Sequence, residues 1–204
     1  SALGGKTAGT VTVSNDINIS GDTSQVTAAL VTAGTKVVAT SATVAISDNP
    51  SITNLNNIAA AAGVVTATLA SADTADLLNL TTSSTDVITL SVNDTPSVAN
   101  LNTIAGKTGG VVTATLAANS LSNLGALTTS STDVITVSVN DASSAERDAS
   151  DLSALGGKTA GTVTVSNDIN ISGTTAEVKA ALVDNATKVV ATSATVAISD
   201  NPSI

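Results

Sequence analysis

Aliphatic and hydroxyl side chains alternate along eight stretches of the chain. In segments such as TVTVSNDINIS, KVVATSATVAIS and VVTATLA, Val or Ile alternates with Thr or Ser. A period of two places the apolar side chains on one face of an extended strand and the hydroxyls on the other. The pattern therefore predicts half-buried strands at residues 10–20, 36–47, 64–70, 86–94, 111–117, 133–141, 162–172 and 188–199.

Between these stretches the apolar spacing changes to three or four residues, which is typical of one face of a helix. Four segments show this spacing, at residues 26–30, 52–58, 98–104 and 178–182. Two further stretches, 72–80 and 119–127, fit either one helical turn or a loop. The chain therefore alternates predicted strands with predicted helices.

Capping signals mark where the predicted helices begin and end. Capping-box spacing occurs at Asp22 with Gln25, Ser143 with Glu146, and Thr174 with Glu177. Prolines 50, 96 and 202 each follow a predicted N-cap, which is Asn49, Thr95 or Asn201. Glycines 63, 106 and 157 are predicted to end helices.

The chain is internally repetitive. Residues 1–52 recur at 153–204 with 45 identities in 52 positions, and all seven differences fall between positions 22 and 34 of the first copy. A shorter echo relates VVTATLA at 64–70 to 111–117, and TTSSTDVITLSVND at 81–94 to 128–141 with one change. Nested periods of this kind indicate a repeat array, which we divide into units of approximately 1–54, 55–100, 101–151 and 152–204.

Strand, helix and glycine turn recurring in steps of about 25 residues predict an α/β solenoid with a parallel β-sheet. We expect residues 1–204 to form one continuous array, and we interpret the chain as a segment of a longer protein. The alternative architecture is a row of tandem all-β sandwich domains.

The composition limits which side chains can fill the core and which partners the chain can bind. The chain has no Phe, Trp, Tyr, Met, Cys or His, so Ala, Val, Leu and Ile must fill a thin, layered interior. A net charge of −9 with only seven Lys and Arg argues against nucleic acid and anionic membrane surfaces as partners. No apolar run is long enough to span a bilayer.

The tripeptide GKT occurs at 5–7, 106–108 and 157–159, and it invites comparison with a phosphate-binding loop. That loop requires a glycine five residues earlier, where this chain has Leu101 and Leu152. The order is also helix, turn, strand, the reverse of the order that aims helix amides at phosphate. We therefore interpret the glycine as a helix C-cap followed by a lysine that suits the helix dipole.

A candidate calcium site has six residues in two copies. The positions match the start of a D-x-N-x-S-G loop, but the twelfth position is Thr27 or Lys179 where a bidentate Glu is needed. A turn followed by a helix cap explains the same residues. The candidates are Asp16, Asn18, Ser20, Asp168, Asn170 and Ser172; no other metal or cofactor is indicated.

Pairs of Asp and Asn close four of the strand-like runs, at 48–49, 93–94, 140–141 and 200–201. Stacked in a solenoid, they would form a column of oxygen atoms able to hold divalent cations between steps. Helix capping and Asx-turns explain them without an ion, and we favour that interpretation.

Threonine repeats at strand spacing are the remaining feature. Thr-x-Thr or Thr-x-Ser occurs at residues 10–12, 66–68, 89–91, 113–115, 136–138 and 162–164, which resembles the hydroxyl ranks of ice-binding β-solenoids. Thr is also an ordinary strand-surface residue. Without His or Cys, and with both Glu residues, Glu146 and Glu177, in capping positions, we expect no enzymatic activity.

Three segments, LNTIAGKTGGVVTATLA, VTVSNDINISGTTAEVKAALV and TDVITVSVNDA, carry a resemblance to a class of proteins. They resemble the Thr, Ala, Asp and Gly-rich tandem repeats of giant secreted or cell-surface proteins of bacteria, including cyanobacteria. The resemblance implies an extracellular structural segment of a filament, stalk or surface layer. We expect the chain to act by stacking and self-association, with polysaccharide or the cell envelope as a further partner. The alternatives are a surface adhesin and an ice-binding solenoid.

Overall fold

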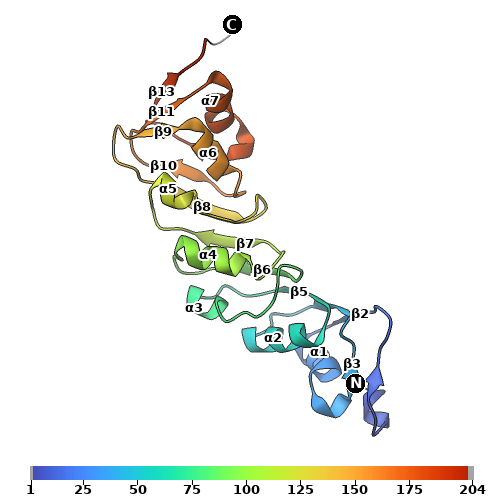
Figure 1. Ribbon diagram of the computed structural model, residues 1–204. Helices are drawn as coiled ribbons and strands as arrows, with labels where there is room; N and C mark the ends of the chain where they lie inside the picture. The colour runs from blue at the N-terminus through green and yellow to red at the C-terminus, as the bar shows by residue number, and fades with distance from the viewer. Residues whose placement is uncertain (1, 202–204) are drawn as a thin grey trace. The chain divides into compact units, whose positions relative to one another are not determined.

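The computed structural model describes residues 2–201 of the chain as an alternation of short helices and short strands (Figure 1). The chain divides into two compact units. Unit 1 comprises Ser1–Asn93 and Thr103–Val111, and unit 2 comprises Asp94–Asn102 and Val112–Ile204. Helix α4 (Val98–Ala105) contributes residues to both. Each unit is described below by itself.

The strands of unit 1 are parallel and follow one another in chain order. The larger set comprises β2 (Asn18–Gly21), β4 (Thr43–Ile46), β5 (Val64–Thr68) and β6 (Val87–Ser91). Asn18 lies beside Thr43, Thr43 beside Val64, and Thr66 beside Val87, so paired residues are 25, 21 and 21 positions apart. A separate parallel pair joins β1 (Val11–Thr12) to β3 (Val37–Val38).

The helices of unit 1 supply the other half of its core. They are α1 (Thr23–Leu30), α2 (Ile52–Ala61) and the single turn α3 (Thr74–Leu77), with short 3-10 helices η1 (Gly4–Lys6) and η2 (Ala33–Thr35). Leu55, Ile58 and Leu77 from the helices are fully buried, as are Val65 and Ile88 from the strands. The core is an aliphatic layer between helices and strands, as the absence of aromatic residues requires.

Unit 2 has two parallel sheets. The first contains β7 (Val112–Thr115), β8 (Val134–Val139), β10 (Val163–Val165) and β12 (Val189–Val190) in that order. The second contains β9 (Glu146–Asp148), β11 (Asn170–Gly173) and β13 (Thr195–Ile198). Helices α5 (Leu121–Leu124), α6 (Ala149–Gly156) and α7 (Thr175–Leu182) and the 3-10 helix η3 (Asn185–Thr187) complete the unit.

The predicted α/β class is confirmed, and the all-β sandwich alternative is wrong, because helices alternate with parallel strands in both units. The stretches 72–80 and 119–127 each contain one helical turn, α3 and α5. Among the described residues, no helix combines the length and apolar character that a membrane span requires.

Four of the predicted strands were wrong in extent, since each contains two strands separated by a corner. These are the stretches 10–20, 36–47, 162–172 and 188–199. In the third stretch, Val163 and Val165 are buried before the corner, and Ile169 and Ile171 after it. Val165 and Ile169 are four residues apart, so the alternation continues in phase through the corner. Periodicity alone therefore cannot reveal the corner.

Two of the predicted capping boxes are confirmed, and the third is wrong. The boxes at Asp22 of α1 and Thr174 of α7 have both reciprocal hydrogen bonds. Glu146, in contrast, begins strand β9, where parallel pairing with Asn170 holds it extended. Helix α6 starts only after Asp148.

The N-caps predicted before the prolines were placed too early. The hydroxyl of Ser51 accepts a hydrogen bond from the amide of Asn54 at the start of α2, and Ser97 does the same for Asn100 in α4. The helices begin only at Ile52 and Val98, so the serine that follows each proline is the residue in the capping position. Asn49 and Thr95 are therefore not N-caps, and Pro202 lies outside the described residues.

Buried carboxylates satisfy strand amides within each unit. The Oδ1 atom of Asp86 accepts from the amide of Val65 at 2.8 Å, and Oδ1 of Asp133 accepts from Val112 at 2.8 Å. Both side chains are buried, and their second oxygens accept from the amides of Ser83 and Ser130. These aspartates join consecutive strands at positions where the backbone ladder alone leaves donors unpaired.

On the helical side of each unit, an asparagine also forms hydrogen bonds from one step to the next. The amide group of Asn56 donates to the carbonyl of Asn79 at 2.8 Å and accepts from the amide of Thr81 at 2.8 Å. Asn102 makes the corresponding pair of bonds with Ala126 and Thr128 at 2.9 Å each. Each asparagine therefore holds the loop that follows the next helical turn.

Candidate assembly interface

The interpretation of the GKT glycine as a helix C-cap is confirmed at Gly157 and wrong at Gly5, which lies inside the 3-10 helix η1 with Thr7 as its C-cap. Gly157 is the C-cap of α6, and Lys158 donates to the carbonyl of Gly125. The hydroxyl of buried Thr159 accepts from the amide of Gly161 at 2.8 Å. A Cβ atom at Gly161 would lie 2.4 Å from the carbonyl oxygen of Ile135, so this position has room only for glycine. Thr108 and Gly110 repeat the arrangement in unit 1.

The calcium candidates lie along extended backbone. Asn18 and Ser20 belong to β2, and Asn170 and Ser172 belong to β11, each pair separated by one residue of a strand. Asp16 and Asp168 lie in the corners before these strands. A calcium loop must wrap its ligands around one point, whereas a strand spreads alternate side chains along a line.

In the second set of calcium candidates, Asp168 and Asn170 already form hydrogen bonds within the protein. The hydroxyl of Ser143 donates to Asp168 and lowers the pKa of that carboxyl below its ordinary value. The side chain of Asn170 donates to the carbonyl of Ser144 at 3.2 Å. Within residues 2–201, no three acidic, His or Cys side chains gather in a group that could hold a metal ion. Four of the six candidates thus belong to strands, and only Asp16 and Asp168 lie in turns.

The carboxylates that close strands bond to the helix of the preceding step. Asp48 accepts from the hydroxyl and the amide of Thr23 at 2.6 and 2.7 Å, and Asp200 accepts from both groups of Thr175 at 2.7 Å. Thr23 and Thr175 are the first residues of α1 and α7. These hydrogen bonds, from the hydroxyl first, lower the pKa of both carboxyls. Each carboxylate therefore caps the helix that precedes it in the chain, and not the helix that follows it.

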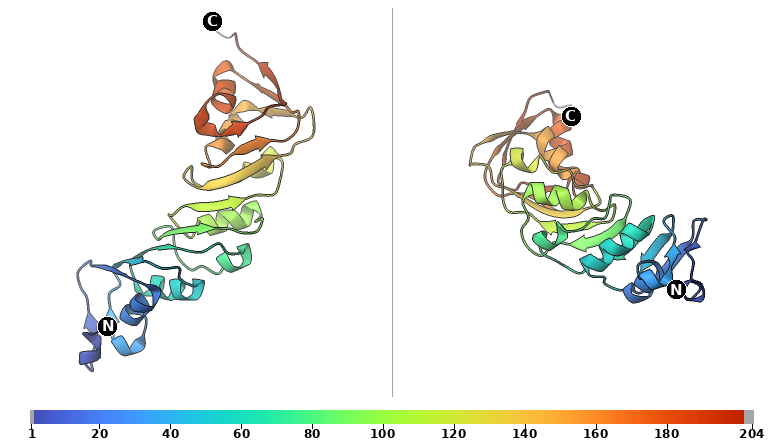
Figure 2. Two further views of the ribbon diagram at one scale, coloured as in Figure 1. Left: turned by 180° about the vertical axis from the view of Figure 1, so that it is seen from behind. Right: turned by 60° about the horizontal axis from the view of Figure 1, so that its bottom comes forward.

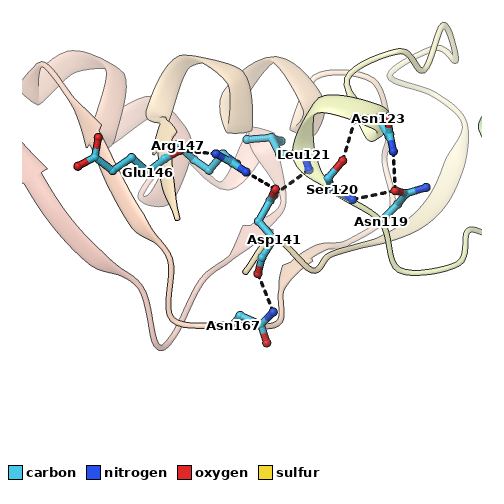
Figure 3. Close-up of polar contacts among 8 residues, drawn as sticks. All are labelled: Asn119, Ser120, Leu121, Asn123, Asp141, Glu146, Arg147 and Asn167. Atoms are coloured by element: carbon cyan, nitrogen blue, oxygen red, sulfur yellow. Dashed lines mark hydrogen bonds and ion pairs between the residues drawn. The ribbon is translucent and has the colours of Figure 1, made fainter. Parts of the chain in front are cut away.

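Asp141 is the buried member of this group and has an additional partner (Figure 3). Its carboxylate receives hydrogen bonds from the guanidinium of Arg147 and from the amide of Leu121, the first residue of α5. The side chain of Asn167 donates to its backbone carbonyl at 2.7 Å. Arg147, and after it the Leu121 amide, hold the pKa of the Asp141 carboxyl below its ordinary value, although burial acts in the opposite direction.

The pair of Asp141 and Arg147 was missed by the sequence analysis. Its signal was weak, namely that the only arginine of the chain follows a strand-closing aspartate by six residues. A pocket of about 710 Å³ lies beside it, lined by Arg147 and Lys158 together with Glu146, Asp148 and Asp151. Lys158 and Arg147 each donate a hydrogen bond to an oxygen atom of the chain, whereas the buried Nε atom of Arg147 has no hydrogen-bond partner among the described residues.

The two copies of the 52-residue repeat expose different sides. Val44 and Ile46 of β4 are 0% and 8% exposed, whereas Val196 and Ile198, the same residues in β13, are 42% and 45% exposed. The difference arises because β5 pairs with β4, while β13 is the outer strand of its sheet. The C-terminal copy therefore leaves uncovered an apolar edge that the N-terminal copy covers.

At the other side of the repeat, the first copy is the exposed one and the second copy is buried. Leu3 is 67% exposed and Ile17 is also exposed, whereas Leu155 and Ile169, their counterparts in unit 2, are buried. In unit 2 the strand β11 that follows Ile169 pairs with β9, but the equivalent strand β2 has only β4 beside it among the described residues. Each surface that is exposed in one copy is therefore buried in the other copy, where a neighbouring step covers it.

The uncovered side of unit 2 is formed by β12, β13 and α7, which we call the C-terminal face. Both views of Figure 2 place these red elements at the end of unit 2, and no described strand of the unit lies beyond them. Val183 is exposed on it together with the residues of β13, whereas Val190 is about as exposed as Val38, its counterpart in unit 1. An outer strand also presents unpaired backbone donors and acceptors, which favour pairing with another strand.

Comparisons with protein-family models, with curated proteins and with solved structures gave no match to this chain.

Proposed function

We propose that the chain is a structural repeat segment of an extracellular filament, stalk or surface layer, and that it acts by stacking and self-association. The observation that carries the proposal is that the apolar edge of one step is buried by the step beside it. Val44 and Ile46 of β4 are buried where β5 pairs with that strand. A sequence that buries its apolar edge only against a neighbour favours assembly.

The proposal includes a solenoid arrangement of the steps. Within each unit, strands pair with the strand of the next step, and the paired residues are 21 to 26 positions apart, as for Thr43 with Val64 and Val163 with Val189. Carboxylates and asparagines bond from one step to its neighbour, as Asp48 does with Thr23. Repeated contacts between sequential steps are the defining feature of solenoid proteins.

The energetic advantage of covering the C-terminal face comes from its aliphatic side chains and its backbone. Burying a Val or Ile side chain completely is worth about 1.5–3 kcal/mol. Val196 and Ile198 are already partly covered, so each would contribute roughly half of that. Pairing of the β13 backbone with another strand adds hydrogen bonds that water now provides.

Concentration-dependent self-association tests the proposal. We expect the chain to form end-to-end assemblies, detected by sedimentation velocity and by electron microscopy, and we expect Val196→Lys with Ile198→Lys to reduce assembly. The matched control is Thr195→Lys with Ala197→Lys, because the equivalent residues Thr43 and Ala45 stay exposed even where the step is covered. A compact monomer by small-angle scattering at all concentrations would overturn the proposal.

The remaining parts of the proposal concern location and chemistry. An acidic chain without Cys, Met or aromatic residues offers few oxidisable side chains, which suits an exposed extracellular position. We assign it no catalytic activity, and we expect self-association to be its principal interaction. Secretion of a tagged full-length protein into the medium or onto the cell surface, against retention inside the cell, tests the location.

Ice binding is a second candidate because threonines lie side by side on the exposed strand faces. Thr68 lies beside Thr89 in unit 1, and Thr115 beside Thr136 in unit 2, and all four are exposed. Exposed Val87 and Val134 occupy neighbouring positions on these faces. If ice binding is the function, the chain should show thermal hysteresis, and Thr113→Lys should abolish it. Absence of thermal hysteresis in the unchanged chain would exclude this candidate.

A further inference from the structure

We infer that the pocket between helices α4 and α5 of unit 2 binds a neutral ligand rich in hydroxyl groups, namely a neutral oligosaccharide. The pocket has a volume of about 660 Å³, which lies within the range of about 300–1,000 Å³ that is typical of small-molecule sites. All the residues that line it belong to unit 2. The inference goes beyond the proposed function and does not depend on it, because the site is complete within one unit.

The lining of the pocket selects an uncharged ligand. Among the described residues, no charged side chain lines the pocket, although the chain has a net charge of −9. A charged ligand would lose hydration there without gaining a counter-charge. The apolar lining comes from Pro96, Val98, Leu116 and three alanines, and the polar lining comes from Asn, Ser and Thr. A sugar matches both parts, since it presents C–H groups and hydroxyls but no charge.

Two asparagines at α5 present fixed hydrogen-bonding groups to the pocket. The Oδ1 atom of Asn119 accepts from the amide of Ser120 and from Nδ2 of Asn123, at 2.9 Å each (Figure 3). These bonds orient both side chains. The Nδ2 atom of Asn119 and the Oδ1 atom of Asn123 have no hydrogen-bond partner within residues 2–201. An amide donor and an amide acceptor held in place can bind neighbouring hydroxyl groups of a sugar.

The backbone amide of Ala117 is a further donor in the pocket. In unit 1 the equivalent amide, that of Ala70, donates to Oδ1 of Asn49 at 2.6 Å. Unit 2 has Thr95 in place of Asn49, and the Ala117 amide has no hydrogen-bond partner in the part of the chain that the structure describes. Thr95 and Ala117 both line the pocket. The replacement therefore leaves a backbone donor available to a ligand.

The sequence of unit 2 differs from that of unit 1 mainly where the pocket lies. Residues 111–117 repeat 64–70 without a change, whereas 118–127 share with 71–80 only the two leucines that are buried in both units. Both stretches form one helical turn. The pocket residues Asn119, Ser122 and Asn123 take the places of Ala72, Ala75 and Asp76. The turn therefore folds without these polar groups, which favours a role for them in binding.

Saturation-transfer NMR of the full chain with neutral tetrasaccharides tests the inference. The probes are cellotetraose, maltotetraose and laminaritetraose, which are glucose oligomers that differ in linkage. We expect at least one of them to bind and to slow hydrogen exchange at the Ala117 amide. A glucosamine tetrasaccharide is the charged comparison, because the acidic chain attracts it, and we expect it to protect this amide less. Absence of binding by all three neutral probes, or equal protection by the charged one, would overturn the inference.

Thr95→Asn tests the position of the site in a folded chain. The new side chain should bond to the Ala117 amide as Asn49 does to Ala70 in unit 1. With one hydrogen bond lost to the ligand, we expect binding to weaken about threefold to tenfold. Thr162→Asn, the same change at an exposed position outside the pocket, should leave binding unaltered. An equal effect of the two variants would show that the sugar binds elsewhere.

A double variant tests the side-chain groups. Asn119→Ala with Ser122→Ala introduces the residues that unit 1 has at the equivalent positions, so the turn should still fold. The change removes the free Asn119 donor and the Ser122 hydroxyl, and we expect it to weaken binding at least roughly tenfold. Undiminished binding in this variant would overturn the inference.

Discussion

The hydroxyl of Thr159 forms two hydrogen bonds with the backbone of one residue, Ile135. It accepts from the Ile135 amide and donates to the Ile135 carbonyl, each at 2.8 Å. Thr108 bonds to Ile88 in the same way in unit 1, at 2.7 and 2.8 Å. Both threonines are the last residue of a GKT segment, and both are buried. The repeated segment thus places a hydroxyl where strand β8 or β6 lacks a backbone partner.

Replacing Thr159 with Val should destabilise the chain strongly for so small a change. Valine has the same shape but cannot bond to the amides of Ile135 and Gly161, which remain buried and unpaired. Each unpaired buried group costs about 1–3 kcal/mol, so we expect the free energy of unfolding to fall by at least about 2 kcal/mol. Urea unfolding followed by circular dichroism measures this. Thr162→Val, at an exposed position directly before β10, is the control and should change stability little.

Asp133, directly before strand β8, provides a second prediction. Both carboxylate oxygens of Asp133 accept from backbone amides, those of Val112 and Ser130. In Asp133→Asn one oxygen becomes an NH₂ group that faces a donor, so one amide loses its acceptor. We expect a loss of about 1–3 kcal/mol in the free energy of unfolding. Asp16→Asn makes the same change in charge at an exposed corner, and an equal effect of the two would contradict the prediction.

The sequence predicted the alternation of strands and helices because period and capping are local properties. Val and Ile at every second position mark β5, β6, β7 and β8 closely, and the capping boxes at Asp22 and Thr174 mark the helix starts. The corners within 10–20 and 162–172 were not predictable in this way. Their apolar residues stay in phase, so only pairing with a neighbouring step shows where the strand bends.

The site was less predictable because it depends on which step lies beside which. Residues 36–49 and 188–201 have the same sequence, yet Val44 is buried and Val196 is exposed. No property of the segment itself distinguishes the two. The bond from Asp48 to Thr23 likewise joins residues 25 positions apart, so the sequence indicated a cap but assigned it to the wrong helix.

The asparagines of α2 and α4 provide a third prediction. Replacing Asn56 with Ala removes a donor to the Asn79 carbonyl and an acceptor for the Thr81 amide. Two hydrogen bonds at a half-buried position are worth about 0.5–1.5 kcal/mol each, so we expect a loss of roughly 1–3 kcal/mol in stability. Amide hydrogen exchange at Thr81 should accelerate as well. Asn57→Ala, at the exposed neighbouring position, is the control, and faster exchange at Thr81 in that variant would count against this role for Asn56.

The pair of Asp141 and Arg147 predicts a specific response to acid. Because Arg147 and the Leu121 amide lower the pKa of Asp141 in the folded chain, the carboxyl contributes stability above its unfolded pKa of about 3.9. That contribution is lost as the pH falls through the lower, folded pKa. In Arg147→Met the depression is relieved while burial remains, so the variant should be less stable than the unchanged chain near neutral pH. The difference should shrink as the pH falls to about 3 and below.

Urea unfolding of the unchanged chain and of Arg147→Met across this pH range measures that difference directly. The carboxyls of Asp48, Asp168, Glu177 and Asp200 also have lowered pKa values, so both proteins should lose stability in acid. Their contribution cancels when the two are compared at each pH. Lys179→Met removes one positive charge at an exposed position of α7 and controls for net charge. A stability difference for Arg147→Met that stays constant with pH, or that Lys179→Met reproduces, would show that the guanidinium does not act through Asp141.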